Sequence, residues 1–266
     1  MYHFPTFDLY LYKDMKCNFH THTTRCRHAT GTEREYIEKA IEAGYQILGF
    51  SDHSPYLFEE GHVSPYRMKL EELEGYIKTV DNLKQEYKKD IQIFTGLELE
   101  FLPKYFEKTF HEIEQYSLDY LILGQHYLDE ECPEDGAGYE WRDEERLKTY
   151  IDRVIEAIDT GYFLYVAHPD IINYVGDEAT YKKHMKRLVT EFKKHNMPIE
   201  INVNGCRERR IYPNKYFIEL GIENGNDFIV GVDAHSPQDL TDRDTYQECL
   251  DLAPGAIMWT GERQIK

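Results

Sequence analysis

Short apolar runs alternate along the chain with longer segments whose apolar positions recur at helical spacing. Seven runs have the composition of strands, at 16–19, 47–51, 91–97, 120–124, 163–167, 198–202 and 228–232. The clearest helical segments between them are 32–44, 70–89, 142–161 and 180–195. The runs are apolar throughout rather than alternating, which is typical of strands buried on both faces of a parallel sheet. The pattern therefore predicts consecutive βαβ units.

Two architectures fit such units, an open doubly wound sheet and a closed α/β barrel. The first run is followed by NFHTHTTRC rather than by a glycine-rich phosphate loop, which disfavours a nucleotide-binding sheet. We therefore expect a distorted seven-stranded (β/α)7 barrel, similar to a TIM barrel but one strand short. Its functional site would lie at the C-terminal ends of the strands. Because no linker or low-complexity tract divides the chain, we expect residues 1–266 to form a single domain.

The amino-acid composition excludes several classes of binding partner and site for this protein. With 31 Lys and Arg against 49 Asp and Glu, the formal charge is −18, which argues against nucleic acid or an anionic membrane as the main partner. The five cysteines are widely spaced without a CxxC motif, so neither a disulfide framework nor a thiolate zinc site is expected. Neither a signal peptide nor a run of about 18 apolar residues is present. These features predict a cytoplasmic monomer or small homo-oligomer.

Polar residues gather where the predicted strands end. Seven of the 12 histidines and at least two carboxylates occupy these positions: His20, His22, His28, His53, Glu98, His126, His168, Asp233 and His235. The carboxyl ends of parallel strands meet at one face of a barrel, so these side chains should converge. Seven converging imidazoles would repel one another if protonated, and neutral imidazoles that share divalent cations avoid this problem.

The spacing also fits metal ligation. Residues two apart on a strand point to the same side, so His20 with His22, and Asp233 with His235, each present a pair of ligands. A set of imidazole and carboxylate ligands suits Zn, Fe or Mn rather than Ca or Mg. The set exceeds the need of one ion, and a carboxylate such as Glu98 can bridge two. We expect two or three divalent transition-metal ions.

Several neighbouring residues admit two roles. His28 and His53 are candidate ligands that could instead orient another ligand. Asp52 fits such an orienting role better than direct ligation, and Glu100 lies on the same strand face as Glu98 as an alternative ligand.

An arginine follows the sixth predicted strand and could grip a phosphate. Arg207 is that candidate, because a guanidinium can bind phosphate through two parallel hydrogen bonds. Arg209 and Arg210 are adjacent, so the alternative is a solvated basic loop, and Arg67 is a weaker candidate for a charge near the substrate.

These motifs together resemble the PHP family, named for polymerase and histidinol phosphatase. The shared pattern is His20-Thr21-His22, Asp52-His53, Gly96-Leu97-Glu98, His126, His168-Pro169 and Asp233-Ala234-His235. The resemblance covers about residues 16–240 and is strongest to monofunctional histidinol-phosphate phosphatases, through segments such as GFSDHSP and EINVNGCRERRIYPN. Asn18, in place of a common Asp, and the looser Gly124-Gln125-His126 depart from the pattern without removing a ligand.

The resemblance implies a trinuclear metal site in a seven-stranded barrel. It groups the ligands as His20, His22, Glu98 and Asp233 for the first ion, Glu98, His126 and His168 for the second, and His28, His53 and His235 for the third. It also implies hydrolysis of L-histidinol phosphate to L-histidinol and phosphate, a step of histidine biosynthesis.

The expected chemistry is attack on phosphorus by a metal-bridging hydroxide, with Asp233 or His235 protonating the leaving alkoxide. Another phosphomonoester is the main alternative substrate, such as a nucleotide, a sugar phosphate or phosphotyrosine. A related metallohydrolase that cleaves an amide or lactone is disfavoured, because the fourth predicted strand ends in Gly124 and not in a lysine. A noncatalytic metal-binding module would be expected to lack ligands, and none is missing.

Overall fold

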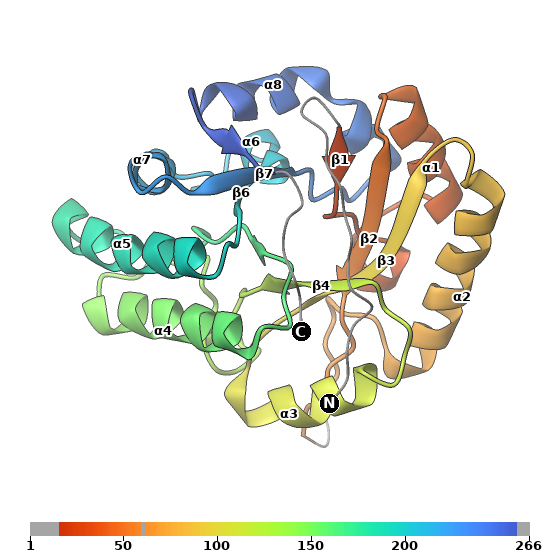
Figure 1. The fold of residues 1–266 in the computed structure, drawn as a ribbon. Helices are drawn as coiled ribbons and strands as arrows, with labels where there is room; N and C mark the ends of the chain where they lie inside the picture. Colours follow the sequence, from red (N-terminus) through yellow and green to blue (C-terminus); the bar gives the residue numbers. More distant parts are fainter. Residues whose placement is uncertain (1–15, 60–61, 260–266) are drawn as a thin grey trace.

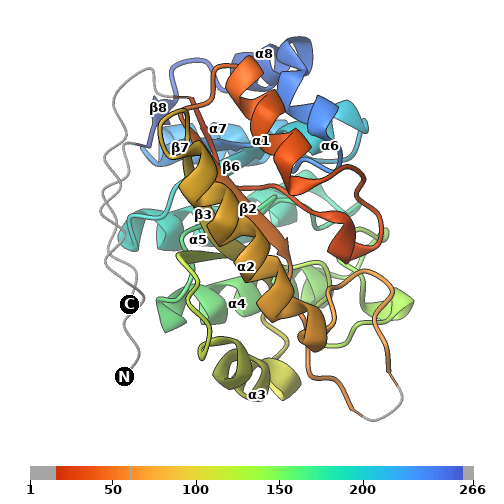
Figure 2. The ribbon, with the colours of Figure 1, turned by 90° about the vertical axis from the view of Figure 1, so that its right-hand side faces the viewer.

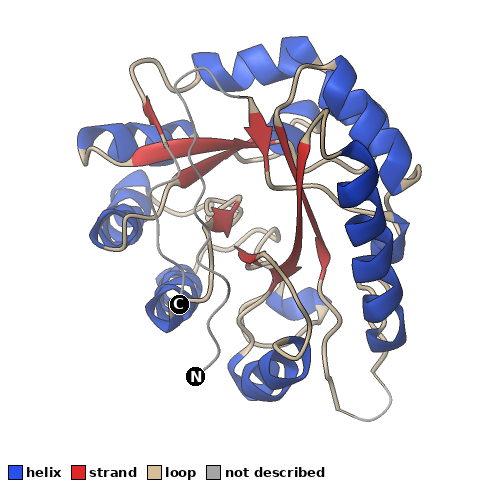
Figure 3. Ribbon diagram, turned by 45° about the vertical axis from the view of Figure 1, so that its right-hand side comes forward, coloured by secondary structure: helices blue, strands red, loops and turns tan. Residues whose placement is uncertain are grey.

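The computed structural model describes residues 16–59 and 62–259 and contains one curled sheet of parallel strands (Figures 1 and 3). The eight strands pair in chain order. Their bounds are β1 (Cys17–Asn18), β2 (Ile47–His53), β3 (Gln92–Leu99), β4 (Tyr120–Gly124), β5 (Val166–Ala167), β6 (Ile199–Asn202), β7 (Asp227–Gly231) and β8 (Ile257–Met258). This arrangement confirms the predicted TIM-like α/β class with a parallel sheet.

Helices lie around the outside of the curled sheet (Figures 1 and 2). They are α1 (Glu33–Glu42), α2 (Leu70–Tyr87), α3 (Pro103–Ile113), α4 (Glu144–Thr160), α5 (Glu178–Lys194), α6 (Val203–Arg207), α7 (Lys215–Glu223) and α8 (Arg243–Asp251). Three short 3-10 helices cover Thr24–Cys26, Pro133–Asp135 and Pro237–Thr241. Among the described residues, no helix is both long and apolar enough to cross a membrane.

The helix boundaries follow from local capping. The Thr32 side chain accepts from the Glu35 amide, and the Glu35 carboxylate accepts from the Thr32 amide, so both exchange hydrogen bonds at the start of α1. Asp143 caps the start of α4, and Gly161 ends that helix at φ 77°, a left-handed conformation that glycine adopts without strain. The four predicted helical segments therefore correspond to α1, α2, α4 and α5.

The prediction of seven strands is wrong, because an eighth strand pairs with the start of β7. Only two residues form β8, and Ile257 and Met258 are exposed, so neither length nor burial marks this strand in the sequence. Past the carboxyl ends of β1 and β7, the chain makes one further parallel bridge between Thr21 and Ala234. The sheet is thus a curled half-barrel, and this bridge brings together the segments that follow β1 and β7.

A tyrosine inside the curled sheet ties its first strands together. Tyr120 is fully buried on β4, and its hydroxyl lies 2.8 Å from the carbonyl oxygen of Phe19 and 3.0 Å from that of Phe50. Gly49 and Gly96 make room for it, because a Cβ at either position would collide with the Tyr120 ring. The Tyr120 side chain therefore links β4 to β2 and to the segment that follows β1.

We expect Tyr120→Phe to lower the free energy of unfolding by about 1–2 kcal/mol, because buried carbonyl groups lose a donor. Denaturant unfolding measures the change. Tyr139→Phe is the matched control, since that side chain is 56% exposed and should tolerate the loss of its hydroxyl. Equal stability of the Tyr120 variant and the wild-type protein would contradict this role.

Candidate metal centre

The nine predicted ligands come together at the carboxyl ends of the strands, as their order in the chain predicts. His53 ends β2 and Glu98 lies near the end of β3, while the others follow their strands directly or in the next loop. Eight of the nine line a cavity of about 530 Å³. The ninth, His20, is fully buried and contacts two of the lining carboxylates.

Glu98 lies at the centre of this cluster. Its two oxygens lie within 3.7 Å of the imidazole nitrogens of five histidines, namely His20, His22, His53, His126 and His168. Neither oxygen has a hydrogen-bond partner among the described residues, although both are buried. Gly124 on the neighbouring strand accommodates the carboxylate, because a Cβ there would collide with it.

Asp233 forms the second focus of the cluster. Its Oδ1 lies 3.1 Å from Nε2 of His22 and 3.4 Å from both Nε2 of His20 and Nδ1 of His235. Its Oδ2 accepts from the side-chain amides of Asn202 and Asn204, each at 3.3 Å. The amides hold one oxygen, so the other faces the imidazoles.

Four histidines are oriented through Nδ1, which leaves Nε2 as the nitrogen turned toward the cluster. Carboxylates accept from two of them: Glu200 Oε1 lies 2.8 Å from Nδ1 of His20, and Glu100 Oε1 lies 3.1 Å from Nδ1 of His126. Backbone carbonyls accept from the other two: that of Cys26 lies 2.8 Å from Nδ1 of His28, and that of Asp233 lies 3.1 Å from Nδ1 of His235. An imidazole that donates through Nδ1 carries a bare lone pair on Nε2. The Nε2 atoms of His28 and His235 nevertheless lie only 3.0 Å apart. Two facing lone pairs repel unless a proton or a cation lies between them.

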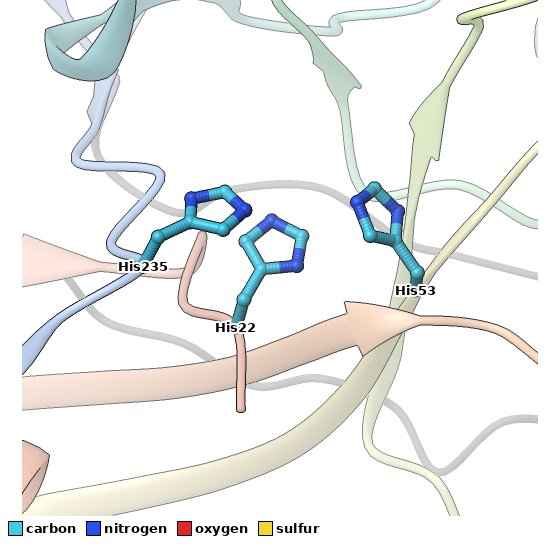
Figure 4. A group of neighbouring side chains, drawn as sticks. All are labelled: His22, His53 and His235. Atoms are coloured by element: carbon cyan, nitrogen blue, oxygen red, sulfur yellow. The ribbon is translucent and has the colours of Figure 1, made fainter. Parts of the chain in front are cut away.

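The residues fit divalent metal ions. Several buried nitrogens and oxygens have no hydrogen-bond partner within residues 16–59 and 62–259: His20 Nε2, His22 Nδ1, His168 Nδ1 and both Glu98 oxygens. Unpaired buried polar atoms are costly, and a cation satisfies them. Among the groups whose ligand atoms all lie within 4.8 Å of one another are His20–His22–Asp233, His20–Glu98–His168 and His22–His53–His235. In the last group, the His22 ring lies between those of His53 and His235 (Figure 4).

The electrostatics divide the candidate ligands. Burial lowers the pKa of His22, but Asp233, Asp52 and Glu98 together raise it to about 9, so this imidazole must lose a proton to bind a metal ion, whereas Glu98 and His235 already have the protonation states that ligation requires. Burial alone would raise the pKa of Glu98, but the imidazoles of His53, His126 and His20 hold this pKa well below its usual value. Burial, together with the neighbouring His22, lowers the pKa of His235 to about 3. The carboxylate is therefore ionised at neutral pH and His235 is neutral, as metal-binding side chains must be.

Two of the candidate ligands have unusual backbone conformations. His168 has φ 31° and Asp233 has φ 52°, in a region that residues with a side chain seldom adopt. Such conformations persist where the surrounding structure fixes them, and they concentrate at functional sites. Here they turn a side chain into the cavity immediately after a strand.

The residues with two predicted roles lie beside the cluster. Asp52 accepts from the Thr23 hydroxyl and from the His53 amide, and its Oδ1 is 3.6 Å from Nδ1 of His22. Glu100 accepts from Arg67, from the Tyr127 amide and from His126 Nδ1. Glu100 thus orients the imidazole of His126, whereas Asp52 is held beside His22 by the Thr23 hydroxyl and the His53 backbone amide.

One supporting carboxylate was missed from the sequence. Glu200 on β6 is buried, and its two oxygens accept from Nδ1 of His20 at 2.8 Å, from the backbone amide of His168 at 2.6 Å and from Asn202 at 3.0 Å. Its signal in the sequence is an acidic residue within an apolar strand, two positions before Asn202 and so on the same face.

The arginines differ from the prediction. Arg207 is not among the residues that line the cavity, and its guanidinium instead pairs with Asp242 and Asp239 at 3.2 and 3.7 Å. Arg210 lines the cavity and is exposed. Arg67 also lines it; its Nη2 and Nε pair with Glu100 and Glu131, and its buried Nη1 has no hydrogen-bond partner among the described residues. Two acidic partners late in the chain, which the local motif did not reveal, account for the position of Arg207.

Known proteins are similar to this chain in sequence. The PHP domain family model matches residues 18–204. A protein of Deinococcus radiodurans named probable histidinol-phosphatase is 32% identical over 89% of this chain and 93% of its own length. The histidinol-phosphatase of Bacillus subtilis is 25% identical over 83% of this chain and 94% of its own.

A solved structure has the same fold. The histidinol phosphate phosphatase of Lactococcus lactis, complexed with zinc, L-histidinol and phosphate, has a TM-score of 0.72 at 16% identity, covering 94% of this chain and 99% of that one. The family model and the 32% identical relative indicate the same family, and the fold of the solved structure is consistent with it. This chain belongs to the PHP domain family.

Proposed function

We propose that this protein is a metal-dependent phosphomonoesterase that hydrolyses L-histidinol phosphate to L-histidinol and phosphate in histidine biosynthesis. The observation that carries the proposal is the convergence of seven imidazoles and two buried carboxylates on one cavity. The names of the Deinococcus and Bacillus relatives, together with the ligands of the Lactococcus structure, support the choice of substrate.

The cluster would hold up to three ions of Zn, Fe or Mn. We assign His20, His22, Glu98 and Asp233 to the first ion, Glu98, His126 and His168 to the second, and His28, His53 and His235 to the third, so that Glu98 bridges two ions. Close contacts within each group support this assignment. Bound there, such ions lower the pKa of water toward neutrality and neutralise phosphoryl oxygens.

The chain itself would supply orientation and a proton. Glu200, Glu100 and two backbone carbonyls fix the imidazole rings, so that little reorganisation is needed when substrate binds. We assign protonation of the leaving alkoxide to Asp233 or His235, which lie together at the cavity wall after β7. Because the pKa of each group lies well below neutrality, the group would first take up the proton that the attacking water releases.

A panel of phosphomonoesters tests the function. With the metal-loaded protein, L-histidinol phosphate should have the highest kcat/KM among substrates that include a nucleotide, a sugar phosphate and phosphotyrosine. A higher value for one of the others would assign the same site to that substrate. Release of phosphate from none of them would refute the proposed phosphatase activity.

We expect Arg210→Ala to raise KM for the phosphorylated substrate roughly three- to tenfold, because an exposed cavity cation would be lost. Arg207→Ala is the matched comparison, and its effect on KM should be smaller, since Asp239 and Asp242 already occupy its guanidinium. Steady-state kinetics with constant metal content measures both. The reverse order of effects would restore Arg207 as the phosphate-binding residue.

A further inference from the structure

Two cysteines far apart in sequence bring their sulfur atoms together beside the cavity. Cys206 lies on α6 and Cys249 lies on α8, and their Sγ atoms are 2.8 Å apart. Both are free thiols in the structure. A disulfide joins its sulfurs at about 2.05 Å, so a small approach of the two helices would complete the bond.

The two thiols have different surroundings. Cys249 is fully buried, whereas Cys206 is partly exposed and so can meet a small oxidant. The hydrogen bond from Cys249 lowers the pKa of the Cys206 thiol, and a thiolate is the nucleophile in thiol–disulfide exchange. This arrangement makes Cys206 the attacking thiol and Cys249 the resolving one.

We propose that Cys206 and Cys249 form a reversible oxidation site, which a small disulfide such as oxidised glutathione converts to an intramolecular disulfide. Cys206 Sγ attacks one sulfur of the oxidant and releases one glutathione thiolate. Cys249 Sγ then attacks Cys206 Sγ and releases the second, and the two thiol protons pass to the departing thiolates. The oxidant gains two electrons, and the cysteine pair loses two.

The crosslink would hold in place α6 and the residues after it, which line one side of the cavity. Asn204 on α6 donates to Asp233, and Glu208 and Arg210, which follow α6, line the cavity. Cys249 Sγ also lies 3.8 Å from the carbonyl oxygen of Asn202, at the start of α6. A disulfide would therefore tie α8 to the segment that holds Asp233, and it would close a long loop of the unfolded chain.

Oxidised glutathione added to the metal-loaded protein tests the proposal. We expect a mass loss of two hydrogens, a Cys206–Cys249 crosslink in nonreducing peptide maps and a rise in Tm of roughly 5 °C that dithiothreitol reverses. Cys206→Ser should remove all three effects, and Cys132→Ser should retain them. A glutathione adduct that persists on Cys206, or the absence of a Cys206–Cys249 crosslink after oxidation, would overturn the proposal.

Discussion

Replacing Glu98 with glutamine is expected to lower kcat/KM by roughly 10³-fold or more. Five imidazoles surround this carboxylate, and neither of its oxygens has a hydrogen-bond partner in the described chain. An amide has the same size but lacks the charge, and its nitrogen cannot serve as a metal ligand. Losing several kcal/mol of charge stabilisation in the transition state corresponds to this change in rate.

Metal analysis and steady-state kinetics on the same preparation would measure the effect of Glu98→Gln. Glu107→Gln provides the control, because this exposed residue on α3 makes the same change of charge far from the cluster. If the Glu98 variant retained both metal and turnover while remaining folded, Glu98 would not be the bridging ligand.

The second large effect is expected at Glu200, which is proposed to touch no metal. Glu200 accepts at both oxygens, from His20 Nδ1, from the His168 amide and from Asn202. In Glu200→Gln, one acceptor becomes an amide NH2 that must face a buried donor, so at least one of these hydrogen bonds is lost. We expect metal affinity or activity to fall about 10- to 100-fold, as is usual when a partner behind a ligand is removed.

Competition with a chromogenic chelator separates this positioning role from a general loss of stability. The Glu200 variant should release metal at lower chelator concentration while it keeps a cooperative unfolding transition. Glu223→Gln, an exposed change at the end of α7, should behave as the wild-type protein does. Unchanged metal affinity of the Glu200 variant would show that His20 and His168 do not depend on this carboxylate.

The position of the cluster could be predicted because the parallel order of strands brings their carboxyl ends to one place. His20, His53, Glu98 and Asp233 lie far apart in sequence, yet each comes at or directly after a buried apolar run. Once those runs pair side by side, the side chains that follow have one common face. The order of apolar runs and polar residues along the chain therefore predicted both the parallel sheet and the convergence of the polar side chains.

Other features depend on contacts that no local pattern records. Strand β8 consists of two exposed residues, so it lacks the apolar character by which buried strands are found. Arg207 pairs with Asp239 and Asp242, which follow it by more than 30 positions. Glu200 is hidden within an apolar strand, and its role appears only when the imidazole of His20 lies beside it.

The most direct test of the metal centre is the metal content of the purified protein, measured together with its phosphatase activity before and after chelation. We predict transition metal approaching three ions per chain, activity that falls in proportion as metal is removed, and recovery when Zn, Mn or Fe is restored. Full turnover of L-histidinol phosphate by protein that contains no metal would contradict this prediction.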